Sequence, residues 1–329
     1  MISRVADHCF WLGRYLERAE STARVLSVTR NLALDAGLTA AQCWLPVVIV
    51  AGEEARFGSR FGPEAAEDGD RVQAYLTWDQ ETGVSIQRSV AAARDNARSI
   101  REVVSLETWE ALNELHLWLG SQAGWSEYGE DRHAFYRRVR QAVQGIHGIA
   151  RGTMLHDDAL HFVELGVRLE RAGQTARILD VHHHAIRRIT DASAAPETGL
   201  WLSLLRACSG FEPYMKRCQG RIDREAVVRF LVLEAEFPRS VRFCIHSAWE
   251  RLASIRPPEA EGLPGARSVA RLAELVRWVD GCGALLEGER LHELLTHVVD
   301  ETASICDWIG RELLGYEVAA QSQSQPSPP

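Results

Sequence analysis

A long repeat within the chain constrains its fold more than any other feature. Residues 8–28 read HCFWLGRYLERAESTARVLSV, and residues 161–181 read HFVELGVRLERAGQTARILDV, a shift of 153 positions. Twelve of these twenty-one aligned positions are identical. Weaker matches follow in the same order, WLPVV with WLSLL and residues 75–89 with residues 230–244. Self-similarity at a long fixed period indicates a duplicated structural unit, so we predict two homologous halves.

Helical periodicity dominates the chain, and alternating strand patterns are hard to find. We therefore predict an all-α fold, a helical bundle built from a tandem duplication of a multi-helix unit with pseudo-twofold symmetry. The predicted domains are a first repeat (1–155), a second repeat (156–316) and a disordered tail (317–329). The predicted helices span residues 3–34, 44–57, 84–104, 106–121, 132–154, 157–189, 197–210, 223–234, 238–255, 264–286 and 289–315.

Composition excludes several functional classes. A chain of 329 residues with 46% hydrophobic content can bury a sizeable core. The net charge of −8 argues against a general nucleic-acid or anionic-membrane binder. The seven cysteines form no CxxC pair, and no uncharged stretch reaches 18 residues. We therefore expect a cytoplasmic protein without a signal peptide, a membrane span or a nucleic-acid partner.

The repeated helix carries a charged face beside its apolar stripe. On a helical wheel Glu17 and Arg24 fall within about 20° of each other, with Arg18 on the flank. The second copy repeats this arrangement with three residues: Glu170, Arg171 and Arg177. Glu17 and Arg24 are two turns apart, too far for the usual pair within one helix, so we predict that they meet groups on other helices.

Two interpretations of these charges remain open, beside plain solvent exposure. The charges could form an inter-repeat ion-pair network that fixes helix register. Alternatively, both copies converge on a polar cleft where arginines bind carboxylate or phosphate and carboxylates bind an amine or Mg²⁺. The further candidates for that cleft are Arg14, Asp79, Glu81, Arg94, Arg98, Glu234, Glu236 and Arg239.

Three of the arginines, Arg94, Arg98 and Arg101, share one face of a predicted helix. They could bind an acidic partner or a phosphate. A solvated face, or salt bridges to the acidic residues of the next predicted helix, explains the same pattern. Those acidic residues are Glu107, Glu110 and Glu114.

Motifs for metals, cofactors and nucleophiles are incomplete. Successive histidines in DVHHH (180–184) point about 100° apart on a helix, so at most two could share a metal. In HELLTH (292–297) the second histidine comes one residue too late for a zincin motif. The chain has no GxGxxG, P-loop or GxSxG. We predict no metal site and no cofactor, and the catalytic residues, if any, are unknown.

Four blocks of the chain together resemble the alpha-E domain family, a bacterial all-helical family with a Glu–Arg motif. The blocks are ISRVADHCFWLGRYLERAESTARVL, AAARDNARSIREVVSLETWEALNEL, RGTMLHDDALHFVELGVRLERAGQTARILDV and EFPRSVRFC. The Glu–Arg motif carries over to Glu17–Arg18 and Glu170–Arg171. Two departures stand out: Val167 lies opposite Arg14, and Glu234 is followed by Ala235 where relatives often have arginine.

The resemblance also implies a functional context. Family members are typically encoded beside circularly permuted ATP-grasp proteins, transglutaminase-like proteins and proteasome-like peptidases. We therefore expect an accessory or co-catalytic partner of an ATP-grasp carboxylate–amine ligase in a bacterial peptide synthesis or modification system. The alternatives are a stand-alone enzyme of amide chemistry that uses the Glu/Arg cleft, or a purely structural or interaction protein. Since no nucleophile or metal motif is evident, we expect no independent catalytic activity.

Overall fold

The computed structural model describes residues 1–35, 38–62, 64–192, 197–219, 222–258, 262–286 and 290–316. Within these ranges the chain forms fifteen α-helices and two short 3₁₀ helices, with no β-strand. The predicted all-α fold is confirmed. The tail predicted at 317–329 lies outside the described residues.

Eight helices precede residue 155 and seven follow it. The first group is α1 (Ser3–Asp35), α2 (Ala40–Val50), α3 (Glu54–Phe61), α4 (Gly69–Trp78), α5 (Ile86–Ser99), α6 (Leu106–Leu119), α7 (Gln122–Glu130) and α8 (Arg132–Thr153). The second group is α9 (Asp158–Ala192), α10 (Glu197–Ala207), α11 (Phe211–Cys218), α12 (Arg224–Leu233), α13 (Val241–Ile255), α14 (Ala266–Gly281) and α15 (Arg290–Glu312). The 3₁₀ helices are η1 (Ala65–Glu67) and η2 (Cys282–Leu285).

The sequence prediction missed the short helices α4, α7 and α11 and joined α2 to α3. Helix α7 (QAGWSEYGE) contains two glycines and few apolar residues, so its periodicity is weak. Helix α4 begins with Gly-Asp, two residues that are poor helix formers. Such helices depend on packing against neighbours for their stability, which a local pattern does not reveal.

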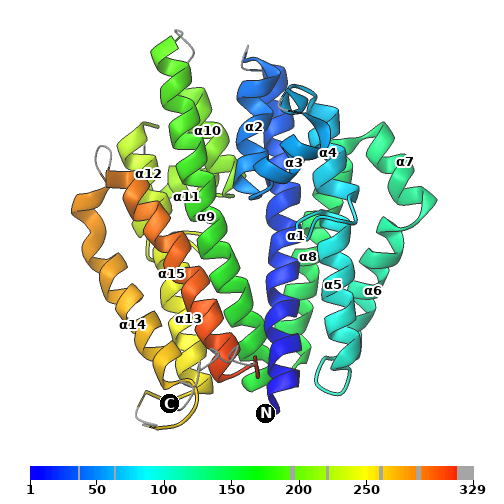
Figure 1. Cartoon of the computed structure of the whole chain (residues 1–329), viewed down its shortest axis with the longest axis vertical. Helices are drawn as coiled ribbons and strands as arrows, with labels where there is room; N and C mark the ends of the chain where they lie inside the picture. The colour runs from blue at the N-terminus through cyan, green and yellow to red at the C-terminus, as the bar shows by residue number, and fades with distance from the viewer. Residues whose placement is uncertain are drawn as a thin grey trace, which may run out of the picture.

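The two long helices α1 and α9 lie side by side at the centre of the molecule (Figure 1). The helices before residue 155 lie on one side of this pair, and most of the later helices lie on the other. Ion-paired partners across the pair, Arg14 with Glu170 and Arg171 with Glu17, are 156 and 154 residues apart. This nearly constant separation means that α1 and α9 run in the same direction.

Two glycines allow the central helices to approach closely. A Cβ atom placed on Gly13 would lie 2.0 Å from the Val163 carbonyl oxygen, and one on Gly166 would lie 2.1 Å from that of Phe10. Gly13 and Gly166 correspond in the 153-residue repeat. The reciprocal contact is what two copies of one unit facing each other would produce. The duplication and the division near residue 155 remain predictions.

One cluster of buried apolar side chains runs through both halves. It includes Phe10 and Leu16 of α1, Leu165 of α9 and Ile305 of α15, each 1% exposed or less. Burial of this apolar surface is the main force that stabilises the bundle. Among the helices of the described ranges, none is long and apolar enough to cross a membrane.

We predict that Gly166→Ala lowers the free energy of unfolding by about 1–3 kcal/mol, because the added methyl group meets the α1 backbone and not a movable side chain. Gly148→Ala is the matched control. Gly148 lies within α8 with open space around its Cβ position, so alanine should stabilise that helix by about 0.5–1 kcal/mol. Urea denaturation measures both, and equal effects would contradict the close approach.

Candidate functional site

Two buried glutamates bind arginines across the α1–α9 interface. Arg171 of α9 donates to Glu17 of α1 with N–O distances of 2.8 and 2.5 Å. Arg14 and Arg18 of α1 each donate to Glu170 of α9 at 2.8 Å. The Glu–Arg motif of each helix therefore pairs with the motif of the other helix. Within the described residues no ion pair joins the group around Glu17 to the group around Glu170, so the two groups are described separately.

The group around Glu17, which we call the Glu17 centre, is filled by its own side chains. These side chains are Glu17, Glu20, Arg24, Arg171 and Arg239. Arg239, which precedes α13, donates to Glu17 at 3.0 Å and also to Glu20. Arg24 donates to Glu20, and both glutamates are fully buried. Gln144 of α8 adds a hydrogen bond to Glu20 at 2.8 Å. This centre matches the ion-pair network expected from the sequence.

The carboxylates of the Glu17 centre are ionised. Burial alone would raise the pKa of Glu17, but Arg171 and Arg239 outweigh burial and lower it. Burial would also raise the pKa of Glu20, which Arg239 and Arg24 instead lower. Burial lowers the pKa of Arg24 to about 10, against the opposing effect of Glu20. All of these groups therefore stay charged at neutral pH, and each depends on its partners.

The Glu170 centre, formed by Glu170, Arg14 and Arg18, opens into a cavity of about 200 Å³ between α1, α2, α9 and α15. Arg14 and Arg18 are 19% and 16% exposed. Arg177 also lines the cavity; it is exposed and has no ion pair or hydrogen bond in the described part of the chain. The lining also includes apolar side chains, among them Val25, Val47, Leu76 and Val299.

The predicted repeat explains why one centre is open and the other is filled. Gly173, which lines the cavity, aligns with Glu20 at the shift of 153. Val84, also in the lining, aligns with Arg239 through the weaker block. Arg177 thus aligns with Arg24 but has no carboxylate beside it. Glu20 and Arg239 help to fill the Glu17 centre. In the Glu170 centre their positions are taken by Gly173 and Val84.

The open centre is suited to bind an anion. The cavity lining contains three arginines and one glutamate, which leaves a net positive charge on the cavity wall. Burial would raise the pKa of Glu170, but Arg18 and Arg14 lower it to about 2. The carboxylate is therefore ionised and already paired. Arginine binds carboxylate and phosphate through paired N–H donors, so the unpaired Arg177 is available for either group.

The acidic candidates Asp79, Glu81, Glu234 and Glu236 belong to neither centre. Arg60 of α3 pairs with Asp79 at 2.5 Å and with Glu81 at 3.3 Å. In the other half Arg217 of α11 pairs with Glu234 at 3.0 Å and with Glu236 at 3.5 Å. These residues join helices within one half.

The arginines of α5 also lie away from the cavity. Arg94 donates to Asn113 of α6 at 2.7 Å, and its guanidinium lies over the ring of Trp109. Arg98 pairs with Asp95 on its own helix at 3.2 Å. Among the described residues no ion pair joins these two arginines to the acidic residues of α6; Arg98 is 61% exposed, as a solvated face would have it.

Sequence reasoning missed several of the interacting residues. Glu20 escaped notice because its counterpart in the repeat is Gly173. Arg60 and Arg217 lie between the aligned blocks, where no match was found. Arg60 pairs with Asp79, and Arg217 pairs with Glu234 in the same way. A longer alignment of the two halves could have matched these two arginines.

Removing Glu17 should destabilise the protein strongly. Glu17→Ala leaves Arg171 without its carboxylate and Arg239 with only Glu20, and these two arginines are only 11% and 13% exposed. We expect a loss of about 3–5 kcal/mol in the free energy of unfolding, measured by urea denaturation. Glu81→Ala, at a carboxylate 78% exposed, is the control and should change little. Similar stability of both variants would disprove a structural role for the Glu17 centre.

Glu170 should make stability depend on pH in a defined acidic window. Its pKa is about 2 in the folded chain, against an ordinary value of 4.5. The contribution is complete above pH 4.5 and is lost as the pH falls toward 2, because the unfolded chain takes up the proton first. The stability difference between wild type and Glu170→Gln should therefore shrink across this window. A difference that stays constant from neutral pH down to pH 2 would contradict the pairing.

The chain is similar over most of its length to part of two longer mycobacterial proteins. The chain is 26% identical to "Uncharacterized protein Mb2597" of Mycobacterium bovis over 289 residues, covering 83% of this chain and 31% of the relative. It is 25% identical over 289 residues to "Uncharacterized protein Rv2567" of Mycobacterium tuberculosis, with the same coverage. The chain thus spans about a third of the length of these relatives. No solved structure matches it.

A family model covers nearly the whole chain. The model is Alpha-E, described as a predicted alpha-helical domain with a conserved ER motif, and it matches residues 1–314. This chain has two Glu–Arg pairs, Glu17–Arg18 on α1 and Glu170–Arg171 on α9. The glutamate of each pair binds the arginine of the other pair. The chain belongs to the Alpha-E family.

Proposed function

We propose that this chain is an accessory protein without catalytic activity of its own, which binds a carboxylate-bearing peptide for an ATP-grasp carboxylate–amine ligase. The peptide carboxylate would bind to Arg177 at the open Glu170 centre, with Arg14 and Arg18 nearby. The apolar wall of Val47, Leu76 and Val299 would take the terminal side chain. This proposal places ligand binding in the cavity and leaves the chemistry to the partner.

The unpaired guanidinium of Arg177 is the observation that carries the proposal. Arg24, its counterpart in the repeat, pairs with Glu20 inside the protein. Arg177 instead lines a cavity that already contains two arginines and one carboxylate. A bound carboxylate would supply the negative charge that Glu20 supplies in the filled centre. Charge-assisted hydrogen bonds of this kind are among the stronger ones in proteins.

The state of the nearby reactive groups favours an accessory role over a stand-alone enzyme. A general base should have a pKa near the working pH, whereas the pKa of Glu170 is about 2. Burial raises the pKa of the Cys306 thiol, which lines the same cavity, to about 11. The thiol is therefore protonated at neutral pH and a poor nucleophile. Glu17 is fully buried and out of reach of a substrate.

The identity of the partner rests on the family resemblance. Family members lie beside genes for circularly permuted ATP-grasp proteins and transglutaminase-like proteins, which fits a bacterial peptide modification system in the cytoplasm. The relatives contain the matched region within a much longer chain, as expected for a module that works beside other domains. Peptide binding here would deliver the carboxylate that such a ligase activates.

Replacing Arg177 should weaken peptide binding without affecting the fold. The probe is an N-acetylated dipeptide with a free carboxylate, compared with its carboxamide by isothermal titration calorimetry. Arg177→Gln should raise the Kd of the carboxylate about 10- to 100-fold, as expected for losing a charged hydrogen-bonding partner. Arg98→Gln, which removes an exposed arginine 61% accessible to solvent on α5, is the matched control and should bind as wild type. Equal affinity for the carboxylate and the carboxamide would contradict the anion site.

The accessory role is tested with the ligase itself. The chain and a co-expressed ATP-grasp neighbour should co-elute in size-exclusion chromatography, and the chain should raise ligase turnover. Arg177→Gln should keep the complex but lose the stimulation, because Arg177 is assigned to peptide binding. Absence of both the complex and the stimulation would disprove the partnership. Amide formation by the chain alone would support the enzymatic alternative.

A further inference from the structure

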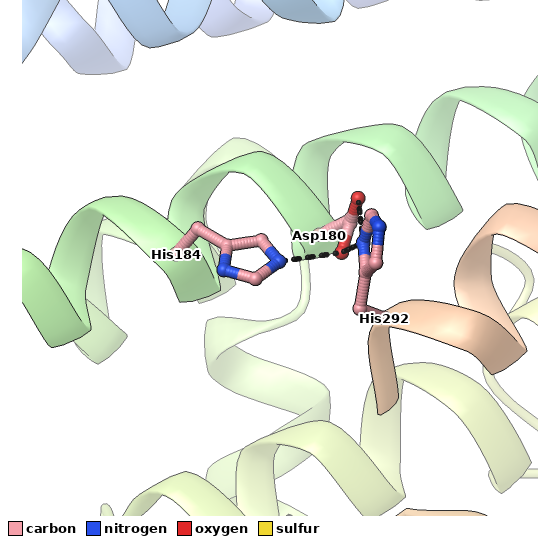
Figure 2. A group of neighbouring side chains, drawn as sticks. All are labelled: Asp180, His184 and His292. Carbon is pink, nitrogen blue, oxygen red and sulfur yellow. Dashed lines mark hydrogen bonds and ion pairs between the residues drawn. The ribbon is translucent and has the colours of Figure 1, made fainter. Parts of the chain in front are cut away.

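Three potential metal ligands meet where α9 lies against the start of α15. Asp180 and His184 are four residues apart on α9, which places both on one helix face. His292 comes from the first turn of α15. Figure 2 shows both imidazoles directed at the Asp180 carboxylate. One ligand atom from each of the three residues lies within 4.8 Å of the others.

We propose that Asp180, His184 and His292 bind a divalent transition-metal ion of the zinc class, with at least one coordination position left for water or a ligand. The donors are His184 Nε2, His292 Nδ1 and a carboxylate oxygen of Asp180. Two imidazoles and one carboxylate suit Zn²⁺, Co²⁺ or Ni²⁺, whereas Mg²⁺ and Ca²⁺ prefer oxygen ligands alone. Three protein ligands with an open fourth position form the usual exchangeable zinc arrangement.

The distances already approach those of a coordinated ion. Asp180 lies 2.9 Å from His292 Nδ1 and 3.6 Å from His184 Nε2. Donor atoms about 2.0–2.1 Å from a tetrahedral ion are about 3.3–3.5 Å apart, so small side-chain rotations would complete the site. Such rotations are possible because His184 and His292 are 45% and 53% exposed.

A second His–Asp contact in the chain shows what distinguishes this cluster. His246 lies 2.9 Å from Asp280, but Arg242 pairs with the same carboxylate at 2.8 Å. A guanidinium there neutralises the aspartate and supplies no lone pair for a metal. At Asp180 the corresponding partner is a second imidazole, which has a lone pair when neutral. The two imidazoles come from different helices, so a bound ion would also link α9 to α15.

The cluster lies about two helical turns from residues that line the cavity of the Glu170 centre, although the metal proposal does not depend on the function of that cavity. Arg177 lies three residues before Asp180 and seven before His184, on the same face of α9. On α15, Val299 lines the cavity and lies seven residues after His292. Seven helical residues span about 10 Å, so a bound ion would add positive charge close to the anion site.

Zinc titration of the full chain without an affinity tag tests the proposal. After treatment with a chelator, calorimetry should show one Zn²⁺ per chain. His292→Asn and Asp180→Asn should each weaken binding by at least about tenfold. His246→Asn and Cys218→Ser are the controls and should bind as wild type, because they remove the other His–Asp contact and the exposed thiol. Melting curves without metal check that each variant is folded, and His184→Asn replaces any variant that is not.

Cobalt spectroscopy identifies the ligands. The Co²⁺-loaded chain should show visible d–d bands without a thiolate charge-transfer band, and His292→Asn should change those bands. The proposal would be overturned by absence of stoichiometric Zn²⁺ binding. It would equally be overturned by binding that survives both His292→Asn and Asp180→Asn but disappears in Cys218→Ser.

Discussion

The close parallel contact between α1 and α9 determines the rest of the structure. Gly13 and Gly166 bring the two backbones together, and this approach lets a glutamate of each helix reach an arginine of the other. A buried carboxylate is tolerated only when it is paired, so the ion pairs and the close packing depend on each other. The surrounding helices then enclose these charges, and their apolar faces form one continuous core.

In both glutamate centres a glutamate of one long helix binds an arginine of the other, but the residues around this pair differ. In one centre Glu20, Arg24 and Arg239 complete an internal network in which both glutamates are fully buried. In the other centre Gly173 and Val84 line a cavity, and Arg177 has no ion pair or hydrogen bond with any residue that the structure describes. A structural role explains the first centre fully. It does not explain the second, where positive charge is left facing an open space, and this asymmetry is why we assign ligand binding there.

The sequence predicted the long helices and the charged motif because both have strong local signals. Helical periodicity marks α1 and α9, and the repeat identified Glu17, Arg171, Glu170 and Arg18 as a group. The sequence could not reveal which residues approach from elsewhere in the chain. Gln144 reaches Glu20 across 124 residues, and His292 reaches Asp180 across 112. Such contacts depend on tertiary packing, for which one sequence carries no local pattern.

The central claim is that the open centre binds an anion because it lacks the acid–base pair that fills the other. The direct test is a Gly173→Glu/Val84→Arg double variant, which introduces the glutamate and the arginine of the Glu17 centre into the Glu170 centre. Calorimetry measures the affinity of this variant for the carboxylate. The Gly173 Cβ position has only Thr302 Oγ1 nearby, at 3.6 Å, so a side chain can enter the cavity. The account predicts a folded protein that no longer binds the carboxylate. Binding with wild-type affinity, or no binding by the wild type, would contradict it.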